Sequence, residues 1–379
     1  MSMRIVMIAS GDGLADPRIA KEAGALVGVG HDVVVLAWDR AGAHPPVLER
    51  DGWRVESLGP RASHGAGLRN VPGYIRFWRD AAGRAAELDP DVVHCHNLDT
   101  VPAALRALKR CAPGTRLVLD FWEIYRESRA IPQHGLAGVL ARTAARVLER
   151  RSIPRADLVI TVVTGQVYYY EGLGARRIAV VENAPDLERY SPLERESGHF
   201  VVSFIGQKRW VPSLLTLMRA VQPYPEMRAL LVGGGPAAEE IERLASSMER
   251  VEVRGRVEPE EIPPLYHECD AVYACYDASL LNWRTSLPVK SMEAMASGLP
   301  VIVTKGTWIA EFVEKHGLGY AVDDSSVGDV ERALVALASD RAAAREMGRR
   351  GREIAERELN WQAAANRLVQ AYEGLARPL

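Results

Sequence analysis

The sequence predicts an α/β protein with two doubly wound parallel sheets, one in each half of the chain. The length of 379 residues exceeds the size at which a single hydrophobic core keeps growing, which favours two domains. In both halves, short β-branched apolar runs alternate with amphipathic segments of helical length, as in βαβ units. A polar, proline-containing stretch at residues 183–198 separates the two series and is interpreted as the connection between the domains.

Residues 1–185 are predicted to form the first domain. Its expected strands are 4–9, 32–37, 53–58, 91–94, 116–120, 158–163 and 178–181, and its expected helices are 16–28, 74–88, 101–110, 136–151 and 165–172. Asp16 stands where a helix N-cap is expected, and Pro17 takes the first helical position, where its missing N–H costs nothing.

Residues 186–360 are predicted to form the second domain. Its expected strands are 200–205, 228–232, 251–254, 271–274 and 300–304, and its expected helices are 213–221, 237–247 and one that runs from Val289 to Ser297. Sheets of this type bind ligands at the carboxyl ends of their strands, so we expect the binding site in a cleft between the domains.

Composition excludes several classes of protein. No apolar run approaches the roughly 18 to 20 residues of a membrane span, and the first residues lack the pattern of a secretory signal, so a cytoplasmic location is expected. A formal charge of −2 argues against nucleic acid as a partner. The cysteines form no CxxC pair and no cluster at zinc spacing, so neither disulfides nor a metal is expected; they are Cys95, Cys111, Cys269 and Cys275.

The most specific segment is 276–304. A loop of small residues leads through Pro288 into a helix on which Lys290 and Glu293, three positions apart, share a face. Free N–H groups at the start of a helix favour an anion such as a diphosphate, which would also offset the charge of Lys290. Glu293, one turn later, can accept hydrogen bonds from a ribose diol. The alternative is an ordinary Lys–Glu pair on the surface of a helix.

The order of motifs along nearly the whole chain resembles the retaining GT-B glycosyltransferases of family four. On the nucleotide side, the resemblance rests on segment 276–304, Gly206, the turn Gly233-Gly-Gly-Pro236 and residues 251–270. On the acceptor side it rests on residues 3–39, Asp91-Val-Val-His94-Cys-His96-Asn-Leu-Asp99, Asp120-Phe-Trp-Glu123 and Asn183-Ala-Pro-Asp186.

This resemblance implies two Rossmann-like domains that face each other across a cleft, with a last helix at 361–379 that packs back on the first domain. It also implies retaining transfer of a sugar from a nucleotide diphosphate (UDP, GDP or another) to a small-molecule or glycan acceptor. The leaving phosphate would take the acceptor proton, so no dedicated protein base is required. No aspartate pair suggests an obligatory Mg²⁺, so no metal is expected, and no cofactor is expected beside the nucleotide sugar. The sequence leaves open whether the protein is a monomer or a homodimer.

The resemblance also assigns the donor site residue by residue. Glu293 would hold the ribose, and the implied donor-binding set is Gly206, Gly233, Gly234, Val257, Thr285, Ser286, Leu287, Lys290 and Glu293. The chain departs from the family pattern at Thr285, which replaces a glutamate. It departs again at Gln207 and Pro212, which replace an Arg and a Lys. Stabilisation of the leaving diphosphate is therefore assigned to Lys290 with Lys208 or Arg209, although the last two can equally be solvated loop cations.

On the acceptor side, Trp122 stands where many relatives have a histidine, and it can offer a flat apolar platform or form part of the core. If Asp16 is a helix cap, Gly13 and Arg18 remain free to face the cleft. His96 is preferred over His94 because it lies nearer the loop. The expected acceptor-binding set is Gly13, Arg18, His96, Trp122 and Glu123.

Other functions remain as alternatives. Gly11 and Gly13 after the first strand, with Asp39 ending the second, form a weak dinucleotide fingerprint, but Asp16 occupies the place of its third glycine. A noncatalytic sugar-nucleotide binder is the main alternative because Thr285, Gln207 and Trp122 all depart from the family pattern. A GT-B epimerase or phosphorylase would share the architecture.

One predicted helix has an unusual charge pattern. Arg142, Arg146 and Arg150 recur at four-residue spacing beside apolar residues within 136–151. Such a helix can lie on an anionic membrane surface and reach a lipid-linked acceptor, or it can simply present a solvated arginine face.

Overall fold

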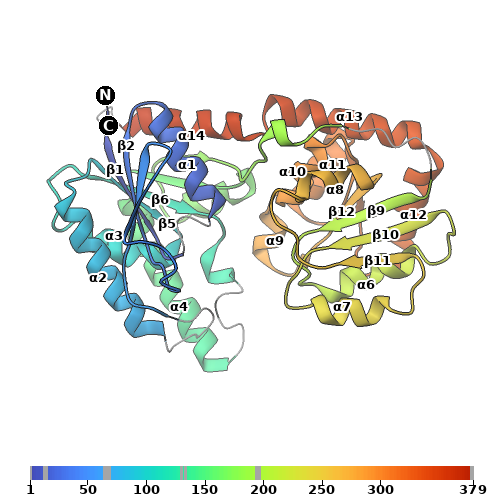
Figure 1. Ribbon diagram of the computed structural model, residues 1–379, viewed down its shortest axis with the longest axis horizontal. Helices are drawn as coiled ribbons and strands as arrows, with labels where there is room; N and C mark the ends of the chain where they lie inside the picture. The colour runs from blue at the N-terminus through green and yellow to red at the C-terminus, as the bar shows by residue number, and fades with distance from the viewer. Residues whose placement is uncertain are drawn as a thin grey trace. The chain divides into compact units, whose positions relative to one another are not determined.

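The computed structural model describes residues 2–11, 16–62, 70–128, 131, 135–192 and 198–375. The chain divides into two compact units (Figure 1): unit 1 is Met1–Glu182 with Ala365–Leu379, and unit 2 is Asn183–Ala364. Each unit contains its own parallel sheet flanked by helices, so the predicted α/β fold class with two Rossmann-like sheets is confirmed.

Unit 1 has an eight-stranded sheet in the order β3-β4-β2-β1-β5-β6-β7-β8. Its strands are β1 (Arg4–Ala9), β2 (Asp32–Ala37), β3 (Val47–Arg50), β4 (Trp53–Ser57), β5 (Val92–His96), β6 (Arg116–Phe121), β7 (Leu158–Thr161) and β8 (Ile178–Val180). The central strands are continuous buried runs, as expected for a sheet covered on both faces. Strand β3 was not predicted; it is a short, largely exposed edge strand that pairs antiparallel with β4.

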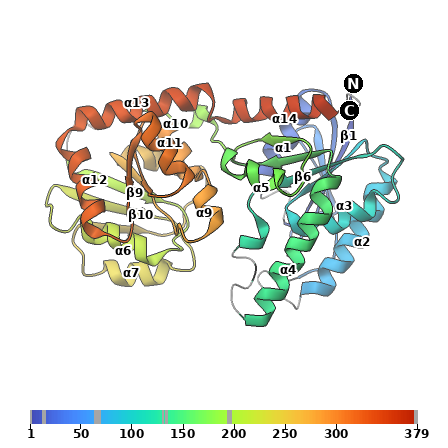
Figure 2. The ribbon, with the colours of Figure 1, turned by 180° about the vertical axis from the view of Figure 1, so that it is seen from behind.

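Helices α1 (Pro17–Gly28), α2 (Val71–Glu87), α3 (Val101–Ala107), α4 (Gly135–Ser152) and α5 (Val167–Glu171) accompany this sheet (Figure 2). The predicted cap of α1 is confirmed, because the Asp16 carboxylate accepts the Arg18 N–H at 3.0 Å. Strand β5 is longer than predicted and runs through both His94 and His96.

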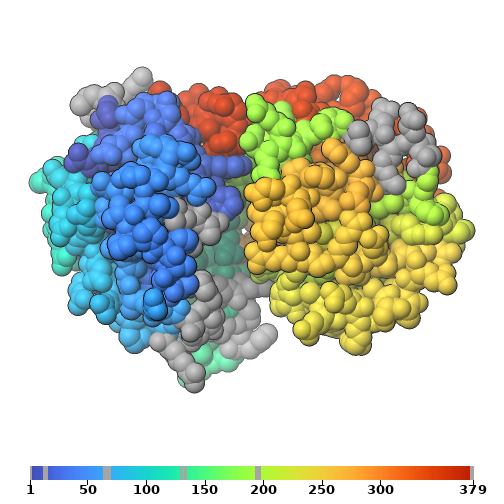
Figure 3. All heavy atoms as spheres, viewed as in Figure 1, coloured from blue at the N-terminus to red at the C-terminus, as the bar shows by residue number. Residues whose placement is uncertain are grey.

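The last helix, α14 (Trp361–Leu375), contributes its second half to unit 1, and it lies at the molecular surface in the space-filling view (Figure 3). Two side chains of α14, Tyr372 and Arg367, bind residues of unit 1. The buried Tyr372 hydroxyl lies 2.7 Å from His94 Nδ1, and Arg367 donates to the Val180 carbonyl at 3.1 Å and pairs with Glu182. A segment more than 180 residues beyond Glu182 therefore closes the core of unit 1.

Unit 2 has a six-stranded sheet in the order β11-β10-β9-β12-β13-β14, all parallel. The strands are β9 (Phe200–Ile205), β10 (Met227–Val232), β11 (Val251–Arg254), β12 (Ala271–Ala274), β13 (Val301–Thr304) and β14 (Gly319–Val322). The direction of strand addition reverses between β9 and β12, which places a ligand-binding crevice outside the carboxyl ends of these two strands.

Among the helices of unit 2, α6 packs against α7 and α12, and α13 packs against α10 and α12. They are α6 (Val211–Ala220), α7 (Ala238–Ala245), α8 (Ile262–Leu265), α9 (Leu281–Thr285), α10 (Val289–Ala296), α11 (Trp308–His316), α12 (Val327–Ser339) and α13 (Arg341–Arg357). Helix α9 lies where a loop was predicted, and β14 was not predicted. Within the described ranges, every helix is too short or too polar to cross a bilayer.

Candidate active site

Two glycine turns meet at the carboxyl ends of β9 and β10. Gly206 and Gly233 have φ angles of +142° and +125°, which side-chain-bearing residues rarely adopt. A Cβ atom on Gly233 would lie only 2.1 Å from the Gly206 carbonyl oxygen, so any side chain there would force the turns apart. Gly234, the next residue of the second turn, is half-buried. The corner thus offers bare backbone to a ligand at the crevice of the sheet.

Lys208 stabilises this corner from inside. Its side chain is completely buried, and Nζ donates to the carbonyl oxygens of Gly233 at 2.6 Å and Arg254 at 2.7 Å. This corrects the interpretation of Lys208 as a cation that faces the diphosphate, because its hydrogen bonds are directed at the loops after β10 and β11. Sequence could not show this, since the partner carbonyls are 25 and 46 positions away.

Two exposed arginines flank the same corner. Arg209 is exposed and donates to the Gln207 side chain at 2.7 Å, so it remains a candidate for contact with the diphosphate. Arg256, which the sequence analysis did not single out, is exposed and its Cβ lies against Gly234. The signal was its position two residues after the end of β11. Val257, the next residue, is half-buried.

Lys290 lies in the first turn of α10 and is buried, with only 6% of its surface exposed. Its Nζ is 3.1 Å from the centre of the Phe204 ring, 5.1 Å from that of Tyr276, and close to Gly206. No hydrogen bond or ion pair of this ammonium is formed with any residue in the described part of the chain. Burial holds the pKa of Lys290 well below its usual range, and the charge of Glu293 offsets only part of this effect.

Glu293, one turn along α10, is placed by two tyrosines. Its oxygens accept hydrogen bonds from the hydroxyls of Tyr190 at 2.8 Å and Tyr266 at 2.7 Å. A carboxylate has about four acceptor sites, so both oxygens can still accept further hydrogen bonds. Neither tyrosine was predicted. Tyr190 lies within the predicted connection at residues 183–198 and Tyr266 lies between α8 and β12, and only the fold brings them to α10.

Two hydroxyl side chains, Thr285 and Ser286, lie in the segment just before α10. Thr285 ends α9 and its hydroxyl donates back to the Leu281 carbonyl at 2.9 Å, while Ser286 donates to Trp283. Leu287 is buried, and Pro288 caps α10 without a side-chain hydrogen bond to its amides. The Tyr276 and Trp283 rings stack with their centres 4.2 Å apart, and Trp283 belongs to α9 in the same segment. Sequence analysis missed this aromatic pair because the helix that aligns it was taken as a loop.

Arg18 in unit 1 is buried, in contrast to the prediction that it is free to face a ligand. It is 5% exposed, and its guanidinium donates to both oxygens of Asp120, at 3.0 and 2.8 Å. It also donates to the Val181 carbonyl and lies 2.8 Å from Glu22. The capping prediction for Asp16 was correct, but it did not leave Arg18 free. Gly13 lies outside the described residues.

His94 and His96 share one face of β5 and stack at 4.4 Å, and both are buried. His96 Nδ1 lies 2.9 Å from Asp120 Oδ2, so the expectation of a histidine open to an acceptor is not met. Trp122 is half-buried and donates from Nε1 to Asp120 at 2.6 Å. Its neighbour Glu123 is also half-buried. The Trp122 ring is thus partly exposed, and its hydrogen bond to the buried Asp120 carboxylate fixes its orientation.

Asp39, the acidic residue of the dinucleotide alternative, uses its carboxylate for its own loop. It accepts the backbone N–H groups of Gly42 and His44, both at 2.8 Å. These bonds hold the pKa of Asp39 below its usual value. The carboxylate organises the turn after β2, which removes the main support for nicotinamide binding.

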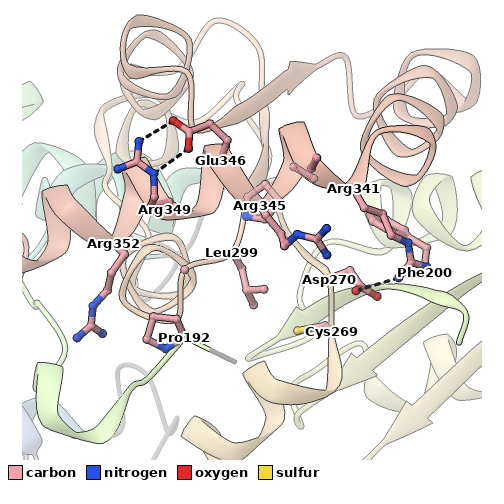
Figure 4. A pocket seen from close by; sticks show the side chains of 14 residues that line it. Pro192, Phe200, Cys269, Asp270, Leu299, Arg341, Arg345, Glu346, Arg349 and Arg352 are labelled. Atoms are coloured by element: carbon pink, nitrogen blue, oxygen red, sulfur yellow. Dashed lines mark hydrogen bonds and ion pairs between the residues drawn. The ribbon is translucent and has the colours of Figure 1, made fainter. Parts of the chain in front are cut away.

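A pocket of about 380 Å³ lies in unit 2 (Figure 4), bordered by the arginine-rich face of α13. Its lining includes Phe200 at the start of β9, Asp270 directly before β12 and Pro300 directly before β13. These are the amino ends of the strands, whereas the glycine turns lie at the carboxyl ends. This pocket is therefore separate from the crevice that carries Lys290 and Glu293.

Two family models match the chain. Residues 15–184 match the glycosyl transferase 4-like domain, and residues 199–340 match the glycosyl transferases of group 1. Among similar proteins, a GDP-mannose-dependent α-(1-6)-phosphatidylinositol monomannoside mannosyltransferase of Mycolicibacterium smegmatis is 27% identical over 371 residues, covering 91% of each chain. A D-inositol 3-phosphate glycosyltransferase of Corynebacterium jeikeium is 26% identical over 298 residues, covering 68% of this chain and 69% of its own.

Solved structures agree in fold. A sucrose-phosphate synthase of Thermosynechococcus elongatus aligns with a TM-score of 0.82 and 18% identity, covering 98% of this chain and 99% of its own. Anabaena HepE in complex with UDP-glucose aligns with a TM-score of 0.72 and 16% identity, covering 98% and 100%. The two family models between them span most of both units, and the order of matched segments is that of the sequence motifs. The chain belongs to the group 1 glycosyltransferases and has their GT-B fold.

Proposed function

We propose that the protein is a retaining glycosyltransferase that moves a sugar from a nucleotide diphosphate donor to an acceptor hydroxyl. The observation that carries the proposal is Lys290, a buried cation beside bare glycine backbone, without an anionic hydrogen-bond partner among the residues described. A buried charge is costly unless it is paired. A diphosphate at the start of α10 would pair with this cation. It would also accept hydrogen bonds from the free backbone N–H groups there.

Glu293 supports a nucleotide as the carrier of that diphosphate. Its carboxylate is one turn further along α10 and is fixed by the Tyr190 and Tyr266 hydroxyls. A ribose diol can bind the remaining acceptor sites bidentately. Along α10, Lys290 comes one turn before Glu293. A sugar nucleotide carries its diphosphate next to its ribose, so Lys290 and Glu293 are in the order that would match these two groups.

Transfer would depend on stabilisation of the leaving diphosphate by Lys290, Arg209 and the amides of the two turns. We propose that the leaving phosphate accepts the proton of the acceptor. The acceptor-side geometry is compatible with this role, because Trp122 cannot accept a proton and His96 is buried against Asp120. Such a reaction delivers the acceptor to the face that the diphosphate leaves, so the anomeric configuration is retained.

The identity of the nucleotide can be tested by thermal shift. Relatives suggest GDP-mannose and UDP-glucose as the first donors to test, followed by ADP and dTDP sugars. A correct nucleotide at about 100 times its Kd should stabilise the chain by about 2.7 kcal/mol, a shift of a few degrees. With the donor known, NMR of the product from a panel of polyol and glycan acceptors gives its anomeric configuration. Inversion would overturn the retaining mechanism.

Glu293→Gln should weaken nucleotide binding roughly 10- to 100-fold, because a hydrogen bond to a charged group is worth about 1.5–3 kcal/mol. Tyr190→Phe is the matched control, since it removes one hydroxyl from the same carboxylate but leaves the charge in place, and it should retain most of the affinity. Isothermal titration with the nucleotide distinguishes the two. Equal affinity in Glu293→Gln and wild type would remove the ribose assignment.

A noncatalytic sugar-nucleotide binder is the second candidate, favoured by the burial of Lys208 and by Thr285. It predicts tight nucleotide binding without turnover. Slow hydrolysis of the donor sugar in water, lost in Glu293→Gln, would decide for the enzyme even before its acceptor is known.

A further inference from the structure

A cluster of four buried side chains in unit 1 takes no part in the proposed donor chemistry. Glu22 comes from α1, His94 and His96 from β5, and Asp120 from β6. They are 0%, 0%, 2% and 0% exposed, respectively. One nitrogen or oxygen from each lies within 4.8 Å of those from all the others. Sequence analysis expected no such set, because Glu22 is 72 positions from His94 and the spacing shows no metal pattern.

Four side-chain atoms of this cluster have no hydrogen-bond partner in the described ranges: His94 Nε2, His96 Nε2 and both carboxylate oxygens of Glu22. Of these, Glu22 Oε1 lies 2.8 Å from Arg18 Nη2 as an ion pair. Glu22 Oε2 and His94 Nε2 are 3.7 Å apart, too far for a hydrogen bond. Buried polar atoms in folded proteins are nearly always satisfied. Something in the centre of the cluster must therefore satisfy them.

The other ring nitrogens are already engaged. His96 Nδ1 lies 2.9 Å from Asp120 Oδ2, and His94 Nδ1 lies 2.7 Å from the Tyr372 hydroxyl. If both Nδ1 atoms carry the proton, both Nε2 lone pairs are directed into the cluster. Histidines that bind metals commonly donate their other N–H to a carboxylate or another acceptor, which fixes the tautomer and the orientation of the ring.

The charges favour a cation rather than an anion. Arg18 binds both oxygens of Asp120, so that pair is close to neutral, and the same guanidinium faces only Glu22 Oε1. Glu22 thus shares one guanidinium with Asp120, and the two carboxylates together outnumber that single positive charge. Asp16, at the rim, adds no positive charge. Two neutral imidazoles and one carboxylate form a donor set that divalent zinc and similar ions prefer, whereas calcium and magnesium prefer oxygen alone.

We propose that Glu22, His94 and His96 bind one structural divalent transition metal of the zinc class, with Asp120 and Tyr372 as the residues that orient the two imidazoles. Ligands about 2.0–2.1 Å from a tetrahedral ion lie roughly 3.3 Å apart, so the observed 3.7 Å between two of them requires only a small contraction. The metal would join α1 to the end of β5.

The test uses the full chain, unfolded with a chelator and refolded with or without zinc, because the site is closed in the folded protein. After gel filtration, elemental analysis should find about one zinc per chain for the wild type, retained with a raised Tm. Refolding with Co²⁺ should give the visible absorption of a tetrahedral site. Glu22→Gln keeps the shape of the side chain and should lose most of the metal, whereas His199→Gln, an exposed histidine outside the cluster, should keep it.

Far-UV circular dichroism and hydrogen exchange of peptides from β5 and β6 show whether unit 1 of Glu22→Gln is folded, since the cluster belongs to that unit. A folded Glu22→Gln that binds as much zinc as the wild type would overturn the proposal. So would a wild type that refolds fully in zinc yet holds none, which would mean that water or a shared proton fills the cluster. Neither outcome depends on glycosyl transfer.

Discussion

Burial of the Lys290 side chain costs the folded chain free energy. Its ammonium is buried against Phe204 and Tyr276, and Glu293, the carboxylate one turn along α10, is held by two tyrosines. Protein families that keep such a residue usually do so for function, because sites that bind charge are built at the expense of stability. The stability of the ligand-free protein is therefore a direct readout of the role of Lys290.

Lys290→Met should stabilise the ligand-free protein at neutral pH, by on the order of 1 kcal/mol or more, while it abolishes nucleotide binding. The depressed pKa of Lys290 means that the unfolded chain binds more protons than the native one between that pKa and about 10.4. The stability of the wild type therefore rises with pH in this interval, and the advantage of Lys290→Met shrinks towards about pH 10.

Urea unfolding near pH 7 and near pH 10 measures this difference. Lys315→Met, at an exposed position of α11, is the control and should change stability little at either pH. A Lys290→Met protein that is less stable than the wild type at neutral pH would show that the ammonium has a structural partner.

At the scale of single residues, sequence correctly placed Lys290 and Glu293 on one helix and failed where a side chain binds a distant part of the fold. Lys290 and Glu293 were found because their spacing along α10 defines a face. Lys208 and Arg18 were misassigned because their partners, the Gly233 carbonyl and Asp120, come from other strands. Composition and spacing cannot show which charge a fold turns inward.

Among the helices, α4 has the most exposed apolar surface. Leu136, Val139 and Leu140 are 76%, 52% and 62% exposed, and Arg146 and Arg150 on the same helix are also exposed. Figure 2 shows α4 along the outside of unit 1. Apolar residues that a soluble helix would bury are here presented beside cations, which is the pattern of a helix that lies on an anionic membrane surface.

We expect the protein to float with vesicles that contain anionic lipid at low salt and to be released as salt screens the arginines. Leu136→Ser with Leu140→Ser should reduce the bound fraction several-fold without changing Tm by more than a degree or two, since neither side chain is buried. Tyr168→Ser, which removes another exposed large side chain outside α4, is the control. Equal flotation of the two variants would leave α4 as a solvated helix.

Secondary structure was predictable wherever the pattern was strong. The central strands of both sheets are continuous, largely apolar and buried runs, and most of the helices have a clear amphipathic period. The missed elements are weak in both respects. Strand β3 is four residues long with one half-buried side chain, and α9 is a five-residue helix in a polar loop. Such elements form because a neighbouring strand or aromatic ring supports them.

At the scale of the molecule, unit 1 depends on α14. Tyr372 is fully buried, and its hydroxyl is the partner of His94 Nδ1. Tyr372→Phe should destabilise unit 1 by about 1–3 kcal/mol, because it leaves a buried ring nitrogen unsatisfied. Hydrogen exchange of peptides from β5 and β6 should then quicken, while peptides from β9 and β10 should be unchanged. Tyr168→Phe, at an exposed hydroxyl, should alter neither set.

The place of α14 also has a consequence for biosynthesis. The strands of unit 1 leave the ribosome first, but the helix that covers His94 and pairs with Glu182 is made only after the whole of unit 2. Until then the nascent unit 1 has an uncovered apolar face, the kind of surface that chaperones bind. Unit 2 can finish folding earlier, because all of its sheet lies within one continuous stretch of chain. The part of the protein that is synthesised first is thus the last to be completed.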